Sequence, residues 1–336
     1  MTDVLHYRDL ELPQQASLPP FKPPPRFGTT YFADFDPQHP SQETAVTQVQ
    51  AFANKPANTQ QNGRWFWQSK AQPGEGLYLD GGFGVGKTHL LASAYHAANY
   101  EHKAYLSFQE LVFTIGFLGM ERAKADLAHY QLYCIDEFEL DDPGNTLIVK
   151  TFLAEVFKRG QHVLTTSNTP PEAQGQGRFN ARDFQREIQS IAERFTVLRM
   201  EGPDYRKRHS LGNLMTGEVF EDSLEHEPMP SPKLLLTWDE LLETLRNLHP
   251  IRFTALLNPI GSLYVRDAQT LEDQNDALRM AHFIDKVYDQ GIGLRVAGEI
   301  APIDIYHPSY RKGAFAKKYE RSLSRLSELL EETFNS

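Results

Sequence analysis

The stretch LYLDGGFGVGKTHLLASAYHAA, residues 77–98, places four glycines within six positions, between an apolar run and a segment rich in Leu and Ala. It fits the pattern G-x-x-x-x-G-K-[ST], with Gly81, Gly86, Lys87 and Thr88 in register. The apolar run before the glycines is typical of a strand, and the segment after them is typical of a helix. Because the pattern requires this context, the stretch predicts a phosphate-binding loop.

Each part of this loop has a role in holding an anion. Glycines let successive backbone N–H groups point at phosphates, and the helix N-terminus adds the positive end of its dipole. The Lys87 amine would reach the β- and γ-phosphates, and the Thr88 hydroxyl would complete the coordination of Mg²⁺. A glycine-rich turn that binds nothing is the alternative, but it would leave a buried Lys87 unpaired at high cost. We expect nucleotide contacts from Gly81, Gly82, Phe83, Gly84, Val85, Gly86, Lys87, Thr88 and His89.

Two acids end the apolar strand LYCIDEF, of which the first, Asp136, lies 49 residues after Lys87. An Asp at this place can hold Mg²⁺ through its water shell, while the adjacent Glu orients and deprotonates the attacking water. Exposed charges at a strand end are the alternative, but the phosphate loop upstream favours the catalytic interpretation. The sequence therefore predicts Asp136 and Thr88 as magnesium ligands and Glu137 as the general base.

A further strand ends in TTSN and places Asn168 at its carboxyl end, where open α/β sheets bind their ligands. The Asn168 amide can hydrogen-bond the γ-phosphate or the attacking water. Alternatively, it makes a turn before the prolines that follow. We favour the catalytic role.

The order of the predicted elements indicates the fold class. KAYLSF, QLYCID and HVLTTSN are typical of strands, with segments of helical period between them. Strands that alternate with helices predict a parallel sheet flanked by helices, which is an α/β fold of the P-loop NTPase class. The Ser41 side chain is expected to cap a helix that precedes this sheet.

Proline-rich and turn-rich stretches of the chain predict the boundaries of its domains. The N-terminal segment, with its LPPFKPPPRF, is rich in proline, and we expect a disordered tail in preference to a docked arm. EHEPMPSPK is typical of a linker, and TWDELLETLRNL opens a new region with a capping box of Thr237 and Glu240. We expect a Pro-rich arm at 1–28, a P-loop ATPase domain at 29–208, a hairpin or linker at 209–233 and a smaller C-terminal α/β domain at 234–336.

The C-terminal region resembles part of the region before it. A shift of 131 residues lays 132–171 on 263–302 without a gap, and ten of the 40 aligned positions are identical. The chain holds either a degenerate repeat or two ordinary strand–helix–strand units of similar periodicity. The alignment pairs the candidate site residues as Asp136 with Asp267, Glu137 with Ala268 and Asn168 with Glu299. Since no phosphate loop precedes the second copy, we expect it to bind no nucleotide.

Composition excludes several classes of protein. The net charge of −10 provides no overall basic field for nucleic acid or anionic lipid. The single cysteine, Cys134, cannot form an intramolecular disulfide, and the N-terminus lacks the pattern of a secretory signal. The longest strongly apolar run, Leu111–Met120, has about half of the ~20 residues that span a bilayer. We expect a cytoplasmic protein.

Several motifs together carry a resemblance to a known family. GGFGVGKTHLL, CIDEFELDD, TTSNTPPE, ARDFQREI and GPDYRKR, with YERSLSRLSELL near the C-terminus, resemble the ZapE family of AAA+ ATPases, which are relatives of the mitochondrial Afg-type ATPases. The resemblance runs from about Phe35 to the C-terminus. The Pro-rich arm and PQHPSQ resemble an actinobacterial-type branch, and SFQEL stands where the family has a basic, His-containing HFHRF.

The resemblance has functional implications. It implies hydrolysis of ATP, whereas the loop spacing alone indicates only a nucleoside triphosphate. It also implies self-association, a cytoplasmic protein that can associate with the inner membrane face, and contact with the division-ring protein FtsZ. AAA+ ATPases complete their site with an arginine from a neighbouring subunit. Similarity places this arginine at Arg182, with Arg178, Arg186 and Arg194 as rivals; Arg206 and Arg325 match family positions to which we assign no role.

Two other functions compete with this interpretation. The loop GGFGVGKTHLL also resembles those of helicase loaders and replication initiators, but residues 234–336 contain no basic recognition helix and the chain is acidic. We therefore expect no general nucleic-acid binding. A nucleotide-gated scaffold that hydrolyses slowly is the remaining alternative.

Overall fold

The structure is a computed structural model that describes residues 4–56, 72–140, 142–174, 182–203, 213–313 and 315–334. The chain divides into two compact units, each with its own sheet. The P-loop unit consists of Leu18–Pro23 and Phe27–Tyr205. The C-terminal unit consists of Met1–Ser17, Pro24–Arg26 and Arg206–Ser336.

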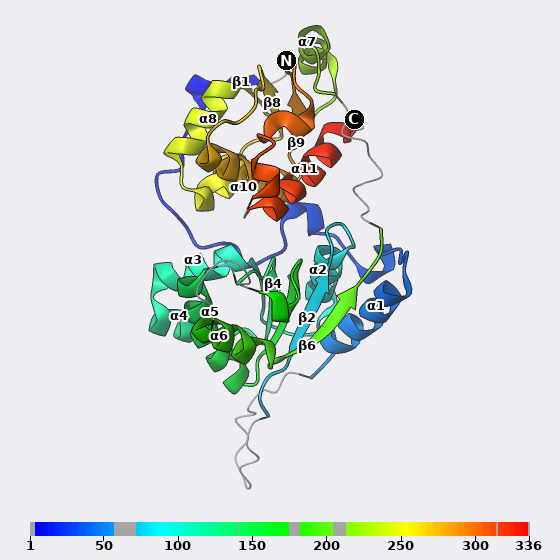
Figure 1. The fold of residues 1–336 in the computed structure, drawn as a ribbon, viewed down its shortest axis with the longest axis vertical. Coiled ribbons are helices and arrows are strands. Elements are labelled where there is room, and N and C mark those ends of the chain that lie inside the picture. The colour runs from blue at the N-terminus through cyan, green and yellow to red at the C-terminus, as the bar shows by residue number, and fades with distance from the viewer. Residues whose placement is uncertain are drawn as a thin grey trace. The chain divides into compact units, whose positions relative to one another are not determined.

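The P-loop unit contains a five-stranded sheet in the order β3-β4-β5-β2-β6, with every neighbouring pair parallel. Because β5 is inserted between β2 and β4, the end of β5 lies between the phosphate loop and the two acids (Figure 1). The strands are β2 (Gly76–Gly81), β3 (Lys103–Ser107), β4 (Leu132–Asp136), β5 (His162–Ser167) and β6 (Phe195–Met200).

Helices cover both faces of this sheet, as the sequence predicts. Alternate strand residues face opposite ways, so that Leu77 and Leu79 pack with α1 and α2, whereas Tyr78 packs with α3, α5 and α6. The α/β fold of the P-loop NTPase class is confirmed. The helices of this unit are α1 (Pro40–Ala53), α2 (Lys87–Ala97), α3 (Phe108–Leu118), α4 (Met120–Asp126), α5 (Pro143–Lys158) and α6 (Arg182–Ala192).

The start of α1 differs from the prediction that Ser41 caps it. His39 is the N-cap residue, and its ring accepts a hydrogen bond from the Ser41 backbone N–H. Pro40 takes the first helical position, where its fixed φ and its missing N–H cost nothing. The helix therefore begins earlier than the serine.

The C-terminal unit contains a four-stranded parallel sheet in the order β1-β7-β8-β9. The predicted capping box is present at the start of α8, where the Glu240 carboxylate accepts from the Thr237 N–H at 2.8 Å. The strands are β1 (Val4–His6), β7 (Lys233–Thr237), β8 (Ser262–Arg266) and β9 (Gly293–Val296). The helices are α7 (Gly217–His226), α8 (Trp238–Asn247), α9 (Phe253–Leu257), α10 (Gln274–Gln290) and α11 (Ala316–Glu331).

The proline-rich N-terminal segment is docked, so the expectation of a disordered tail is wrong for its described residues. Strand β1 extends the C-terminal sheet by pairing with β7. Further along, the Arg26 Nε donates to the Tyr288 carbonyl at 2.7 Å, and its guanidinium lies 3.9 Å from the centre of the Tyr288 ring. Arg26 also forms an ion pair with Glu332 at 2.6 Å. One short strand and one stacked arginine thus anchor the segment.

The two sheets share a structural unit. The order β3–α3, β4–α5–β5 in one matches β7–α8, β8–α10–β9 in the other. However, β8 begins at 262 against 132 for β4, whereas α10 begins at 274 against 143 for α5, so the offset changes from 130 to 131. The ungapped alignment is therefore one residue out of register at the strand ends. Glu137 corresponds to Asp267, since both have a left-handed backbone, with φ of 54° and 63°.

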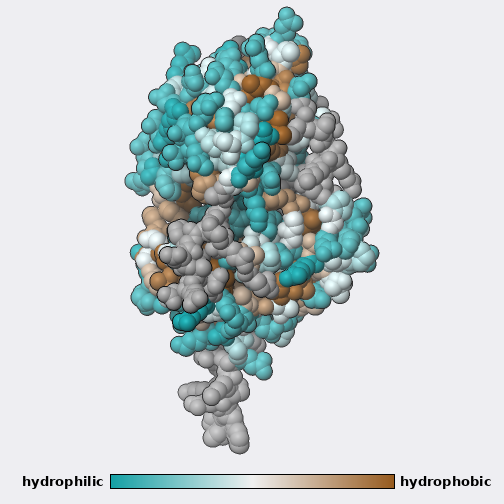
Figure 2. Space-filling view, in the orientation of Figure 1, coloured by the Kyte–Doolittle hydropathy of each residue, from teal (hydrophilic) through white to brown (hydrophobic). Residues whose placement is uncertain are grey.

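Hydrophilic side chains cover much of the face drawn in Figure 2. Large apolar side chains that are exposed come from separate elements, so they do not form one continuous strip along a single helix. They are Leu18, Tyr31, Phe117, Leu147, Val219 and Ile303 among the described residues. In the described part of the chain, no helix is long and apolar enough to cross a membrane.

Candidate active site

The phosphate loop joins β2 to α2 and depends on glycines at two positions. Gly86 caps α2 in the left-handed region at φ 89°, and a Cβ there would lie 2.3 Å from the Phe35 ring. A Cβ on Gly81 would lie 2.4 Å from the Met200 carbonyl oxygen. Buried Gln42 donates to the Val85 carbonyl at 3.2 Å and so holds the loop from α1. This loop therefore has a fixed shape.

Lys87 lies at the first position of α2 and is only 7% exposed. Its amine donates to the carbonyls of Gly81 and Gly82, at 2.8 and 2.5 Å, and to the Asn168 Oδ1 at 2.9 Å. A buried ammonium needs such acceptors. The phosphate-loop lysine and the polar end of β5 are thus in direct contact, although they are 81 residues apart in the chain.

Asp136 ends β4 and is 8% exposed. Its Oδ1 accepts from the Thr88 hydroxyl at 3.3 Å and from the Thr166 hydroxyl, and its Oδ2 accepts from the Tyr105 hydroxyl at 3.2 Å. A carboxylate beside the hydroxyl that follows the phosphate-loop lysine supplies the hard oxygen ligands that Mg²⁺ prefers. Asp136 and Thr88 therefore fit the magnesium that the fold class implies.

Glu137 follows Asp136 in a left-handed conformation, at φ 54°. Its backbone N–H lies 3.1 Å from both the Asp136 Oδ1 and the Thr166 Oγ1, which hold this conformation. A non-glycine residue in this region carries strain of about 1 kcal/mol or more, which the surroundings must balance. After this turn, the Phe138 backbone N–H donates to the Thr166 carbonyl at 2.7 Å.

Two site residues were not predicted from the sequence: Tyr105 and Thr166, whose hydroxyls hold Asp136. Tyr105 lies two residues before the carboxyl end of β3, and Thr166 lies one residue before the carboxyl end of β5; these are the two strands that flank β4. Once the strand order is known, the residues near the ends of β3 and β5 become candidates for contact with the Asp136 carboxylate. The sequence alone does not give that order.

The other predicted contact residues differ in their surroundings. The His89 ring lies 3.1 Å from the Tyr31 carbonyl oxygen and 5.3 Å, centre to centre, from the Phe35 ring. Burial lowers the pKa of His89 below its usual value. The Val85 side chain is buried in the core, so only its backbone is available to a ligand. Phe83 is half-buried in the loop.

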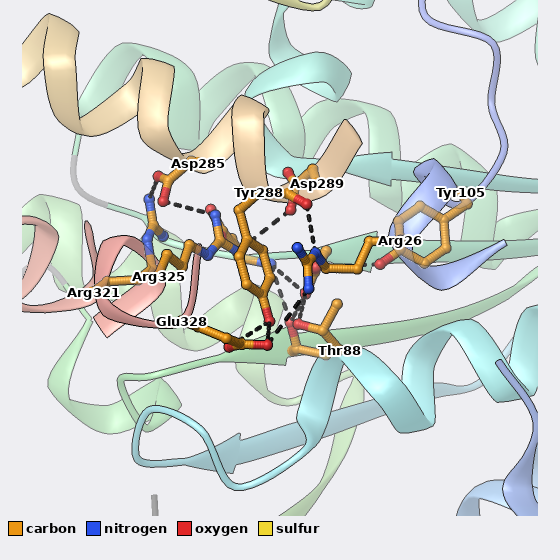
Figure 3. A network of polar contacts seen from close by, with 12 residues as sticks. Arg26, Thr88, Tyr105, Asp285, Tyr288, Asp289, Arg321, Arg325 and Glu328 are labelled. Atoms are coloured by element: carbon orange, nitrogen blue, oxygen red, sulfur yellow. Dashed lines mark hydrogen bonds and ion pairs between the residues drawn. The ribbon is translucent and has the colours of Figure 1, made fainter. Parts of the chain in front are cut away.

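The candidate arginines fall into three groups. Arg182 opens α6, and Arg186 and Arg194 are exposed. Arg178 and Arg206 lie outside the described residues. Arg325 is buried on α11, where it forms ion pairs with Asp285 at 2.7 Å and Asp289 at 3.7 Å and lies 5.1 Å from the Tyr288 ring centre (Figure 3).

The Arg325 cluster stabilises the packing of α11 on α10. Asp285 is buried and forms ion pairs with both Arg321 and Arg325. Burial raises the pKa of this carboxyl, but the two guanidinium groups outweigh burial and bring it to about 2. Removing one partner would leave a buried charge uncompensated. Arg325 therefore has a structural role within the C-terminal unit.

The chain matches a family model and is similar in sequence to named proteins. A model of the family described as AFG1-like ATPase matches residues 31–247. The chain is 25% identical to the cell division protein ZapE of Escherichia coli K12 over 306 residues, which cover 79% of this chain and 80% of that protein. It is 26% identical to lactation elevated protein 1 homolog B of Danio rerio over 162 residues, which cover 42% of this chain and 32% of that protein.

Solved structures resemble the chain more distantly. DnaI has a TM-score of 0.42 and 19% identity, and the match covers 54% of this chain and 93% of that one. The DnaC helicase loader has a TM-score of 0.39 and 16% identity, with coverage of 53% and 99%.

Proposed function

This chain belongs to the AFG1-like ATPase family, and we propose that it couples Mg²⁺-dependent ATP hydrolysis to work on a protein partner, the division-ring protein FtsZ. It is an ATPase with an AAA+ fold of the P-loop class. The partner is proposed because a similar protein is named for cell division. By the same resemblance, we propose a self-associating cytoplasmic protein that contacts the membrane peripherally.

The observation that carries the proposal is the convergence of three loops at one sheet edge. Lys87 contacts Asn168 at 2.9 Å, and Thr88 contacts Asp136 at 3.3 Å. A P-loop lysine, a magnesium-binding pair and a polar amide are the groups that phosphoryl transfer to water requires.

We propose one role for each of these residues. When bound, Mg²⁺ would neutralise charge on the phosphates, held by Thr88 and Asp136. Lys87 would exchange its carbonyl acceptors for phosphate oxygens. The Asn168 amide would donate to the γ-phosphate or the attacking water, and the Glu137 carboxylate would accept the proton of that water. Backbone N–H groups of the loop would surround the phosphates.

The first test compares wild type with Glu137→Gln and Lys87→Ala. We expect Glu137→Gln to bind ATP as wild type does but to lose at least about 10²-fold in kcat, because the base is gone while the loop is intact. Lys87→Ala should lose binding as well. Steady-state turnover and nucleotide titration measure these effects. Turnover that survives in Glu137→Gln would refute the assignment of the base.

The partner is tested by adding purified FtsZ to wild type and to Glu137→Gln. We expect binding of FtsZ that depends on ATP and persists in the hydrolysis-deficient variant, because that variant holds the triphosphate state. Single-stranded DNA serves as the competing partner. Stimulation of turnover by DNA at low salt, without any by FtsZ, would exclude the division-ring proposal and favour a helicase-loader-like function.

A further inference from the structure

One buried amide lies behind the three loops of the active site. Gln174 follows the short 3₁₀ turn Pro171–Ala173 and is 3% exposed. Its Oε1 accepts from the Leu140 backbone N–H at 2.9 Å, which fixes which end of the amide faces which way, since an N–H can only donate. Its Nε2 therefore points the other way, toward a group of hydrogen-bond acceptors.

That group consists of acceptors from all three strands that build the site. The Gln174 Nε2 lies 3.1 Å from the carbonyl oxygen of Phe138, the residue after Glu137. It lies 3.0 Å from the Ser167 hydroxyl and 3.2 Å from the Thr169 carbonyl, on either side of Asn168. The fourth acceptor is the Tyr78 hydroxyl at 2.9 Å, on the strand that leads into the phosphate loop.

Tyr78 reinforces the same connection. Its hydroxyl donates to the Thr169 carbonyl at 2.7 Å while it accepts from Gln174. Burial raises the pKa of Tyr78 well above its usual value, so the hydroxyl keeps its proton. Gln174 and Tyr78 thus form one polar cluster beneath the catalytic edge, inside a core that is otherwise apolar.

We propose that Gln174 is a positioning residue that sets the distance between the Glu137 loop and the Asn168 loop. The inference rests on the ATPase assignment and concerns what orients the two catalytic groups, Glu137 and Asn168. Gln174 acts through its hydrogen bonds to Phe138, Leu140, Ser167 and Thr169, which lie close to Glu137 and Asn168 in the chain. Because a misplacement of about 1 Å in such groups can cost about 10²-fold in rate, loss of this amide should affect turnover more than binding.

The chain provides a matched control. Gln161 is a second buried glutamine, 7% exposed, whose Nε2 donates to the Ala128 carbonyl at 2.9 Å and to the Tyr130 carbonyl. It precedes β5 at the amino end, opposite to the active-site edge. Replacing either glutamine by Met removes a buried amide from carbonyl partners, so both changes should destabilise the protein similarly.

The experiment measures kcat, KM, affinity for a non-hydrolysable ATP analogue and thermal unfolding for Gln174→Met and Gln161→Met in the full chain. We expect kcat to fall roughly 10- to 100-fold in Gln174→Met with analogue affinity within about threefold of wild type. Gln161→Met should unfold at a similarly lowered temperature with kcat within about twofold of wild type. Equal kcat in the two variants would overturn the proposal.

Two further variants keep the test decisive. Gln174→Asn keeps both ends of the amide but is one methylene shorter, so it cannot reach the partners on both sides, and it should show the same fall in kcat if the methionine variant does not fold. In an Asn168→Ala background, Gln174→Met should lower kcat by a smaller factor than it does in wild type, because one of the groups that Gln174 positions is gone. Fully additive effects would contradict the proposal. Absence of turnover in wild type would instead overturn the ATPase assignment itself.

Discussion

At the scale of single residues, two glycines of the phosphate loop are expected to differ in how strongly replacement by alanine destabilises the protein. Gly86→Ala places a Cβ 2.3 Å from the Phe35 ring at a left-handed φ of 89°, so the loop or the ring must move. A Cβ on Gly82 meets nothing within 4 Å. We expect Gly86→Ala to lower the free energy of unfolding by about 1–3 kcal/mol, and Gly82→Ala to change it by less than about 1 kcal/mol. Chemical denaturation measures both.

A similar loss of stability in both variants would contradict this account of the loop.

The pattern in the sequence predicted the residues of the loop, and it also predicted Lys87, Asp136, Glu137 and Asn168 as a site. It could not predict the hydroxyls of Tyr105 and Thr166, because their value depends on which strands flank β4. Gln174 was missed for the same reason: a buried glutamine acquires its partners only in three dimensions.

At the scale of elements, the second strand–helix–strand unit has the same arrangement of strands and helix as the first but not the residues of the candidate active site. Its sheet has no counterpart of β2 with a phosphate loop among the described residues. Arg266 occupies the position of Asp136, with Glu221 at 3.7 Å, so a cation replaces the magnesium ligand. Asp267 retains the left-handed turn of Glu137. We therefore expect this unit to bind no nucleotide.

We accordingly expect one nucleotide per full-length chain, and none in Lys87→Ala. Asp267→Asn should keep kcat within about twofold of wild type and should not destabilise the protein, since Asn tolerates the left-handed region. Its matched counterpart Glu137→Gln should lose turnover. Calorimetric stoichiometry and steady-state rates measure these outcomes. Two nucleotides per wild-type chain would contradict the inference.

Alternation of strands and helices was enough to predict the α/β class of the fold, but two features of the elements were not accessible. Strand β1 has only three residues, too few for a periodic signal, and only pairing with β7 identifies it. The repeat was aligned one residue out of register at β8, because an extra residue before α10 shifts the offset from 130 to 131. An ungapped comparison cannot represent such a change, whereas the left-handed turns at Glu137 and Asp267 reveal it.

At the scale of the whole molecule, AAA+ ATPases complete their site with an arginine from a neighbouring subunit, and this makes activity depend on assembly. Arg182 at the start of α6 is our candidate. We expect the specific ATPase rate to rise with protein concentration. Mixing inactive Lys87→Ala with Arg182→Ala should partly restore turnover, because a Lys87→Ala subunit can lend its arginine to the intact loop of its neighbour.

Controls distinguish a shared site from loss of fold. Arg122 on α4 is an exposed arginine paired with Asp126 at 3.0 Å, so Arg122→Ala should turn over ATP as wild type does. If Arg182→Ala also remains active, the same mixing with Arg186→Ala and Arg194→Ala identifies which rival acts in its place. A specific rate independent of concentration, lost only with Lys87, would mean that each chain completes its own site. The shared-arginine model would then be wrong for this protein, because no neighbour would be needed to stabilise the charge on the γ-phosphate.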